Sequence, residues 1–349
     1  HTDIDVKNVS AVDGKDGNAV AEAIASADIM ATAVGVNVLK FIIPNIANGI
    51  KLRKERNLPP LNIIICENLM DANKVIEKML KEYLTEDEQA WMDENVGLVE
   101  ASIGRMVPVQ TDDMKDGNPM RVCVESYGYL PVDKAAFKGT IPAIKNMVPF
   151  EPFDFYLKRK LYVHNMGHAT CAYLGDILGL EYIYQSIDKD EVYLIVRGAM
   201  EESARALSKK YGVELESILL HITDLLNRFT NAALKDTCKR VGGDPARKLS
   251  PQDRLIGSST LALEVGITPA YIAIGAAAGL NRYLLETEGV EQNMADAKKV
   301  LESHCELAEG SELETLILNM YALILEGKTL PEIRRAADNV VKANLKDVI

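Results

Sequence analysis

The residues best suited to chemistry lie between Lys158 and Gly175, a segment that contains two of the five histidines. On a helix each residue turns by about 100° around the axis. With Lys160 set at zero, His168 falls near 80° and Asn165 near 140°, so the three side chains share one broad face. His164 falls near 40° on the same face, so spacing alone does not choose between the two histidines. The face also holds small residues that predict room for a ligand, namely Gly167, Cys171, Ala172 and Gly175.

The chemistry that fits a lysine, an amide and an imidazole on one face is the interconversion of an alcohol and a carbonyl by hydride transfer. Lysine is a general base when burial or a nearby cation lowers its pKa. Asparagine and histidine then stabilise the developing alkoxide as hydrogen-bond donors. This chemistry requires no metal. A structural interpretation stands beside it, because a Lys-Arg-Lys run is often a solvated face and a single histidine is often a hydrogen-bonded core residue.

The overall composition excludes several classes of protein. The chain has 349 residues, with 39 Lys and Arg against 51 Asp and Glu, and a formal charge of −12. This acidic balance argues against nucleic-acid binding, and no apolar run is long enough to span a membrane. The five cysteines are scattered, which fits neither a zinc site nor a disulfide framework. We therefore expect a cytoplasmic protein with a small-molecule partner, no signal peptide and no metal.

The first part of the chain alternates strands and helices. Short apolar runs predict buried strands at 28–35 and 61–66, and helical spacing predicts helices at 19–27, 36–56 and 71–83. Pro44 is expected to kink or break the second of these helices. Strands separated by helices predict a parallel sheet, that is, an α/β Rossmann-like domain over residues 1–150. Residues 97–108 and 120–132 predict a hairpin or the edge of a mixed sheet.

Beyond residue 150 the pattern is almost wholly helical, which predicts a mainly α-helical substrate or catalytic domain over residues 151–349. Apolar spacing and glycine or proline punctuation predict its helices. The expected ranges are 153–178, 189–211, 214–229, 269–285, 294–306, 312–326 and 331–345.

The glycine-rich turn of a dinucleotide-binding fold, G-x-G-x-x-G, is absent. Gly14 and Gly17 supply only G-x-x-G in a polar context. Either this is not a dinucleotide-binding protein, or the first strand–helix–strand unit lies before His1. We expect the second, which makes the first domain partial.

The pattern Lys160-x4-Asn165-x2-His168, followed by 172–175 (Ala-Tyr-Leu-Gly), resembles the signature of the polyol-specific long-chain dehydrogenases, the mannitol dehydrogenase family. Ordered matches at 32–35, 62–68, 132–139, 198–203 and 247–255 resemble the phosphate-specific branch of that family. The resemblance implies an NAD-dependent oxidoreductase that interconverts mannitol 1-phosphate and fructose 6-phosphate without a metal.

The resemblance also implies catalytic roles residue by residue. Lys160 is expected to be the general base, and Asn165 with Asn68 the oxyanion hole. His168 is expected to orient the substrate hydroxyls. Asn68 is plausible on separate grounds, because it follows a predicted parallel strand at its carboxyl end.

Two further sets of residues follow from the same resemblance. Ala33, Val34 and Gly35, together with Asn68, are expected to contact the NAD cofactor, since a strand end of small residues permits close approach. A sugar phosphate needs local cations in an acidic protein, and the matched segment 247–255 supplies them. The expected phosphate ligands are Arg247, Lys248 and Arg254.

Two alternative functions stay open at this point. One is a related dehydrogenase of an unphosphorylated polyol or a hexonate, which gains weight from Gly104, where the family usually carries an acidic residue before Arg105. The other is a degenerate relative that binds a metabolite without catalysis. The intact set of Lys160, Asn165 and His168 opposes the second.

Overall fold

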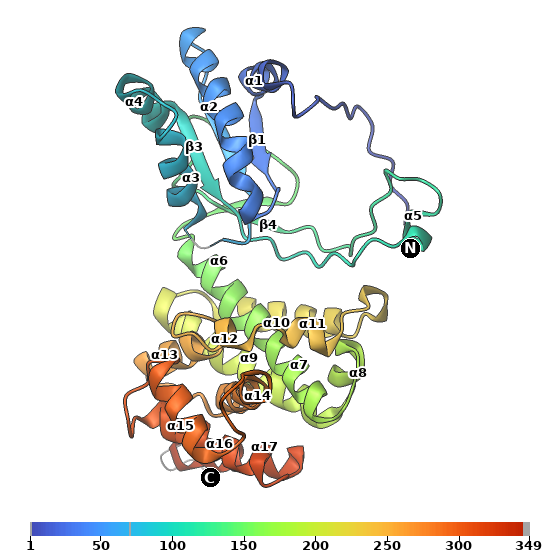
Figure 1. Ribbon diagram of the computed structural model, residues 1–349, viewed down its shortest axis with the longest axis vertical. Coiled ribbons are helices and arrows are strands. Elements are labelled where there is room, and N and C mark those ends of the chain that lie inside the picture. The colour runs from blue at the N-terminus through green and yellow to red at the C-terminus, as the bar shows by residue number, and fades with distance from the viewer. Residues whose placement is uncertain (1, 70, 345–349) are drawn as a thin grey trace. The chain divides into compact units, whose positions relative to one another are not determined.

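The chain divides into two units, and the computed structural model describes residues 2–69 and 71–344. The first unit comprises the residues up to Arg105 together with Ser126–Asp154. The second comprises Met106–Glu125 together with the chain from Phe155 onward. The first unit contains the strands and the second is helical (Figure 1). Among the described residues, no helix is both long and apolar enough to cross a membrane.

A parallel sheet forms the centre of the first unit. Its strands are β1 (Ile29–Thr32), β2 (Leu61–Ile65) and β3 (Val96–Glu100), in the order β1-β2-β3. Every residue of β2 is buried, as expected for a central strand of a sheet covered on both faces. The predicted parallel sheet is therefore confirmed. Thr32 pairs with Ile65, so β1 and β2 end at the same edge.

Helices cover this sheet (Figure 1). They are α1 (Gly17–Ser26), the 3-10 turn η1 (Val36–Val38), α2 (Leu39–Glu55), α3 (Ala72–Lys81) and α4 (Glu86–Asn95). Helix α2 continues past Pro44 and buries Ile43 and Ile50 in the core. Sequence analysis missed α4, although Thr85 and Glu88 form a capping box at its start.

The stretches 97–108 and 120–132 do not form the predicted hairpin; the alternative, the edge of a mixed sheet, is present only as one antiparallel bridge between Ala101 and Val132. Only β3 forms in the first stretch, parallel to β2, while β4 (Leu130–Asp133) pairs in parallel with β5 (Met147–Phe150). The short helix α5 (Asp112–Lys115) lies between β3 and β4 in the chain. The side chain of Gln110 takes the place of a strand ladder: its amide donates to the Cys123 carbonyl at 3.0 Å and accepts from the Cys123 amide at 2.7 Å.

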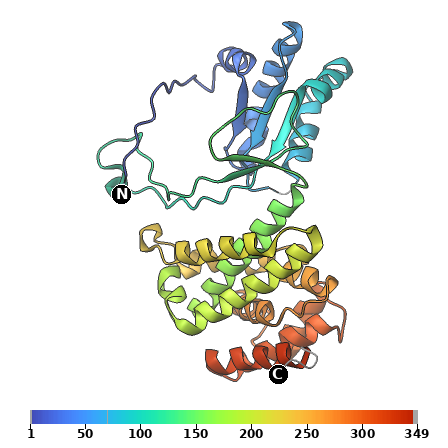
Figure 2. The same cartoon turned by 180° about the vertical axis from the view of Figure 1, so that it is seen from behind.

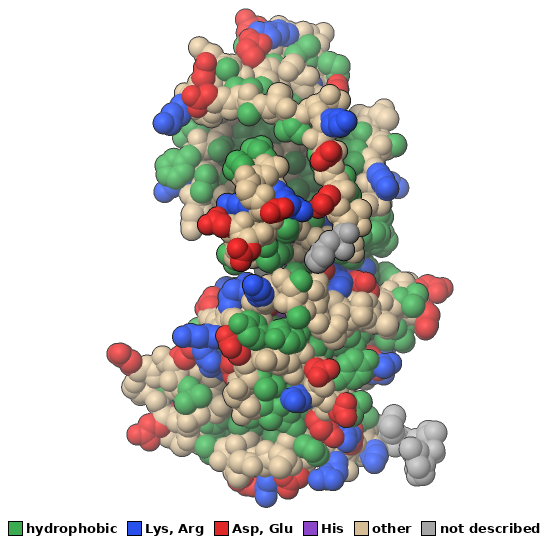
Figure 3. Space-filling view, turned by 90° about the vertical axis from the view of Figure 1, so that its right-hand side faces the viewer, with side chains coloured by type: hydrophobic (Ala, Val, Ile, Leu, Met, Phe, Trp, Pro, Cys, Tyr) green, Lys and Arg blue, Asp and Glu red, His purple; other side chains and the backbone are tan. Residues whose placement is uncertain are grey.

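An apolar groove of about 550 Å³ runs along the first unit, between α1, α2 and β1. Ile24, Met30, Phe41 and Ile46 are among its lining residues. Hydrophobic side chains gather around a hollow of this unit in the space-filling view (Figure 3). In the described sheet β1 pairs only with β2, so this side is the least protected part of the unit's core.

The second unit is a helical assembly in which every helix predicted from apolar spacing is present (Figure 2). Sequence analysis missed only short or weakly amphipathic elements such as α8 and α13. The bounds are α6 Asp154–Arg159, a π-helical segment Lys160–Asn165, α7 Met166–Ile177, α8 Ile183–Ile187, α9 Asp190–Tyr211, α10 Leu215–Phe229, η3 Ala232–Leu234, α11 Cys238–Gly242, α12 Pro245–Lys248, α13 Ile256–Glu264, α14 Ala270–Glu286, α15 Met294–Ser303, α16 Glu312–Leu325 and α17 Leu330–Asn344.

Helix α14 lies at the centre of this unit because it is apolar over most of its circumference. It packs against α7, α9, α16 and α17. Its N-terminus is capped from α9, where the buried carboxyl group of Glu202 accepts the backbone amides of Tyr271 and Ile272 at 3.0 Å. This packing fixes α7, the helix that carries His168.

Candidate active site

The helix that contains the proposed catalytic residues changes its hydrogen-bond pattern at Lys160. Between α6 and α7 the segment Lys160–Asn165 is π-helical, and the Met166 amide donates to the Leu161 carbonyl five residues earlier. In such a segment residues five apart lie one above the other. The π-helical segment therefore brings Asn165 closer to the direction of Lys160 than the 140° expected from an α-helix. Turns of this kind occur frequently at functional sites.

The small residues on this helix do not make room for a ligand, so that prediction is wrong. A Cβ on Gly167 would approach the Met200 sulfur to 2.6 Å, and one on Gly175 would approach the Cys238 sulfur to 2.6 Å. Cys171 and Ala172 are fully buried. These residues are small because neighbouring helices pack closely against α7.

Lys160 lies in surroundings that suit a general base. Burial lowers its pKa, and the positive charge of Arg254 lowers it further. The loop that carries Arg254 is linked to the π-helical segment by Tyr162, whose hydroxyl donates to the Gln252 carbonyl at 3.2 Å. The same hydroxyl accepts from Lys158 at 3.1 Å. The sequence distance between these segments explains why local pattern did not reveal the link.

His168 is held between an aromatic ring and a carboxylate. Its imidazole stacks on Phe229 with ring centroids 4.8 Å apart and planes 14° apart. Its Nε2 lies 3.8 Å from Oδ2 of Asp236. Burial lowers the pKa of His168 to about 4, although Asp236 opposes that effect. The imidazole is therefore neutral at neutral pH, with one ring nitrogen as donor and the other as acceptor.

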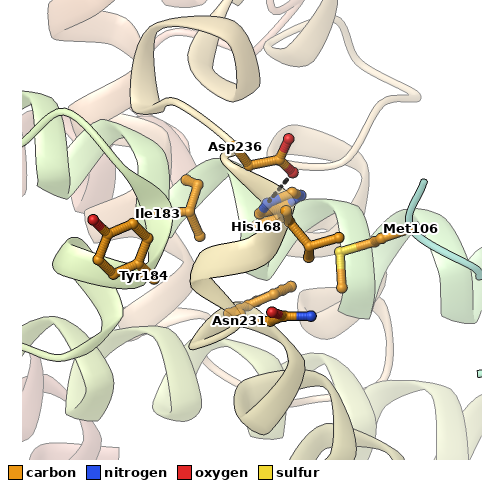
Figure 4. A pocket seen from close by; sticks show the side chains of 8 residues that line it. Met106, His168, Ile183, Tyr184, Asn231 and Asp236 are labelled. Carbon is orange, nitrogen blue, oxygen red and sulfur yellow. Dashed lines mark ion pairs between the residues drawn. The ribbon is translucent and has the colours of Figure 1, made fainter. Parts of the chain in front are cut away.

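His164, the other histidine of this face, also has a pKa held well below its ordinary value by burial. Its ring centroid is 6.1 Å from that of His168. Only His168 of these two lines the small pocket drawn in Figure 4. This favours His168 as the ligand-facing histidine, a choice that the helical spacing left open.

The three predicted phosphate ligands differ in their surroundings. Lys248, on α12, is only 4% exposed, and its pKa is lowered to about 8 by burial and by the charges of Arg254 and Arg247. The side chain of Arg254 is 12% exposed and donates to Asp253 at 2.7 Å. Arg247 is 53% exposed and pairs with Asp244 at 2.8 Å. Lys248 and Arg254 thus form a buried cationic pair, whereas Arg247 lies at its outer side.

Arg254 connects this cationic pair with the proposed catalytic residues. Its charge lowers the pKa of Lys160 and of His168 as well as that of Lys248. The contact that links these segments is made by Tyr162, which lies in the π-helical segment that begins at Lys160 and donates to the carbonyl of Gln252, two residues before Arg254.

In the first unit the predicted cofactor residues form a turn at the carboxyl edge of the sheet. The backbone amides of Val34 and Gly35 donate to the two carboxylate oxygens of Glu67, at 2.9 and 2.8 Å. Gly35 has φ +88°, and a Cβ there would meet open space. Ala33 continues directly from β1, and Asn68 follows Glu67 at the end of β2. All four predicted residues therefore lie at the edge where open α/β sheets bind ligands.

Glu67 is a residue that sequence analysis missed. It is 7% exposed, and it fixes the turn after β1 from the end of β2. A charged residue directly after the almost fully apolar stretch 61–66 was the available signal. Among the described residues, no group of three or more His, Cys, Asp or Glu side chains is placed to hold a metal ion.

Comparison with known proteins gives concordant matches over both units. The profile of the mannitol dehydrogenase Rossmann domain matches residues 1–146, and that of the mannitol dehydrogenase C-terminal domain matches residues 153–324. The mannitol-1-phosphate 5-dehydrogenase of Brevibacillus brevis (strain 47 / JCM 6285 / NBRC 100599) is 37% identical over 275 residues, which is 79% of this chain and 70% of that protein.

Two solved structures share the fold. D-sorbitol dehydrogenase in substrate-free form covers 91% of this chain and 78% of its own, with a TM-score of 0.72 and 16% identity. The Pseudomonas fluorescens mannitol 2-dehydrogenase ternary complex with NAD and D-mannitol covers 94% and 77%, with a TM-score of 0.66 and 15% identity. At these identities the likeness concerns the fold.

Proposed function

Because this chain belongs to the mannitol dehydrogenase family, we propose that it is an NAD-dependent oxidoreductase that interconverts mannitol 1-phosphate and fructose 6-phosphate. The observation that carries the choice of a phosphorylated substrate is the buried cationic pair of Lys248 and Arg254, next to Lys160. Asp253 already pairs with Arg254 at 2.7 Å, but burial and the neighbouring arginines still lower the pKa of Lys248, so the ammonium of Lys248 would gain from a further anion. A substrate phosphate would supply that anion, and Arg247 would extend the set at its exposed side.

The turn at 33–35 fits a dinucleotide. Gly35 lacks a Cβ where one would project into open space, and Glu67 holds the backbone of Val34 and Gly35 in a fixed turn. Ala33, Val34, Gly35 and Asn68 would contact NAD there, at the carboxyl edge of a parallel sheet. When bound, NAD accepts the hydride from the carbon that is oxidised.

Lys160 performs the proton transfer at that carbon. In the oxidation direction its neutral amine takes the proton of the C5 hydroxyl of mannitol 1-phosphate. In the reduction direction its ammonium returns a proton to the C2 oxygen of fructose 6-phosphate. The lowered pKa of Lys160 makes the neutral amine more accessible than that of an exposed lysine.

The remaining polar groups stabilise and orient the substrate. The amide of Asn165 would donate to the oxygen on which negative charge develops, a role that the family resemblance also assigns to Asn68. His168, neutral because burial lowers its pKa, orients the substrate hydroxyls. These assignments are supported by the family resemblance and, for Lys160 and His168, by the burial that lowers their pKa values.

The experiment is to follow NADH absorbance with both substrate pairs, using the wild type and Lys160→Ala. Loss of a general base lowers the rate by about 10²–10⁴-fold. Lys210→Ala is the matched control, because Lys210 lies on α9 with its side chain 49% exposed. No wild-type turnover of fructose 6-phosphate, or near-normal turnover by Lys160→Ala, would contradict the proposal. A wild type that reduces fructose as efficiently as fructose 6-phosphate would favour the unphosphorylated-polyol alternative.

A further inference from the structure

A small pocket beside His168 has no part in the mechanism described so far. Met106, Phe229, Asn231 and Asp236 line it together with the His168 imidazole (Figure 4). Its volume is about 10 Å³, which is room for roughly one water-sized group. Its wall is mostly apolar, with Ile183 and Leu234 beside Met106 and Phe229, and its polar side is formed by His168, Asn231 and Asp236. Such a pocket is suited to one small group that carries a hydroxyl.

The polar side of the pocket has the geometry for a single bridging hydroxyl. Nε2 of His168 and Oδ2 of Asp236 are 3.8 Å apart, which is too far for a direct hydrogen bond. An oxygen at ordinary hydrogen-bond distance from both atoms would form a triangle with them. This oxygen would accept a hydrogen bond from Nε2 of His168 and donate one to Oδ2 of Asp236.

Asp236 is itself fixed in place. Its other carboxylate oxygen pairs with Arg240, and its backbone carbonyl accepts the Ile183 amide at 2.9 Å. The ring of Phe229 stacks on one face of the His168 imidazole. The two groups that would share a hydroxyl are therefore both restrained before a ligand arrives.

The segment that supplies Met106 to the apolar wall of the pocket is also fixed in place. The backbone amide of Met106 donates to Glu125, and Glu125 forms a bidentate pair with Arg228 at 2.5 and 2.9 Å. The side chains of Glu125 and Arg228 are 6% and 8% exposed. Arg228 directly precedes Phe229, so one turn of α10 supports both the imidazole and the segment that supplies Met106.

We infer that this pocket receives the terminal hydroxymethyl group next to the reacting carbon, with its hydroxyl shared between His168 and Asp236 and with Met106 excluding anything larger. This inference rests on the proposed function. In that reaction the phosphate occupies one end of a six-carbon chain, and only one carbon lies beyond the reacting carbon at the other end. A pocket for one small group beside His168 then selects which carbon is oxidised.

The first test compares fructose 6-phosphate with 1-deoxyfructose 6-phosphate, in which a methyl group replaces the hydroxymethyl group. A site built to bind a hydroxyl rejects the analogue that lacks it. We expect kcat/KM for the deoxy analogue to be lower by about 100-fold or more in the wild type. In Asp236→Asn we expect this preference to fall at least tenfold. A wild-type preference under tenfold, or one that Asp236→Asn leaves unchanged, would overturn the inference.

The second test enlarges the pocket. The 1-O-methyl ether of fructose 6-phosphate is too large for the wild-type pocket, and Met106→Ala should raise its kcat/KM relative to fructose 6-phosphate by at least tenfold. Met120→Ala is the control, since Met120 belongs to the same segment and is 78% exposed. An equal gain in both variants, or none in Met106→Ala, would refute the role of Met106. Absence of turnover with fructose 6-phosphate itself would overturn the proposed function and this inference together.

Discussion

Replacement of Lys248 by methionine should stabilise the protein while it weakens substrate binding. Lys248 is almost completely buried on α12, with Arg254 and Arg247 near it. Methionine has similar length and carries no charge, so it removes the cost of burying the ammonium without leaving a large cavity. The two effects have opposite signs because the buried ammonium of Lys248 destabilises the free protein, whereas a bound phosphate would require that charge.

The size of the stabilisation follows from the pKa of Lys248. Its ordinary value is 10.5, and in the folded protein burial and the two arginines lower it to about 8. Below pH 8 the ammonium is protonated in both states, so the folded state carries the full cost. Between pH 8 and 10.5 the unfolded chain binds more protons, so stability rises with pH and the cost disappears. The two values differ by 2.5, which corresponds to about 3 kcal/mol.

The assay is urea unfolding followed by circular dichroism, because the helices of the second unit dominate that signal and Trp91 lies in the first unit. At pH 7 we expect Lys248→Met to raise the free energy of unfolding by about 1–3 kcal/mol, with a gain that vanishes toward pH 10.5. The KM for fructose 6-phosphate should rise at least tenfold, and that for fructose should not. Lys210→Met is the exposed control. Destabilisation at pH 7, together with an unchanged KM, would refute the reasoning.

Two further predictions concern titratable groups of the second unit, Lys160 and Glu202. Arg254→Gln should move the rise of kcat/KM for oxidation to higher pH by about one unit, because the charge of Arg254 lowers the pKa of Lys160. Arg247→Gln, at an exposed arginine, should move this rise less. Equal shifts of the pH profiles of the two variants would contradict this prediction. Burial raises the pKa of Glu202 to about 8 from an ordinary 4.5, so the free energy of unfolding of the wild type should fall as pH rises between these two values. In urea titrations Glu202→Gln should abolish this pH dependence. A pH dependence that persists in the variant would contradict the prediction.

The sequence was informative where a whole element has one environment. Strand β2 is apolar at nearly every position and is buried on both faces, and α14 is apolar around its axis and lies at the centre of its unit. Local pattern therefore predicted both. It failed for residues 102–129, where apolar positions such as Val107 and Met120 suggested strands but remain exposed. A strand also needs a partner, and the side chain of Gln110 occupies the backbone groups of Cys123 instead.

The candidate site shows the same limit. Lys160, Asn165 and His168 lie within nine residues, so a helical projection and a family signature were enough to propose them. Asp236 and Phe229 come from other elements, and no local spacing links them to His168. The projection also assumed uniform α-helical turns, whereas the π-helical segment changes the direction of every side chain after Lys160. Packing between helices, which a single sequence does not encode locally, decided these positions.

The cationic residues of the second unit explain why a phosphate far from the reacting carbon would assist the reaction. In an acidic chain, the positive charge of Arg254 lowers the pKa of both Lys160 and Lys248 through like-charge repulsion. A bound phosphate dianion reverses that effect and raises the pKa of Lys160, so the lysine holds a proton more readily in the complex than in the free protein. In the proposed reduction of fructose 6-phosphate Lys160 would be the proton donor, and the phosphate would thus favour the protonation state that this direction needs. Binding energy at a non-reacting group is then used at the reacting one, which free fructose cannot achieve.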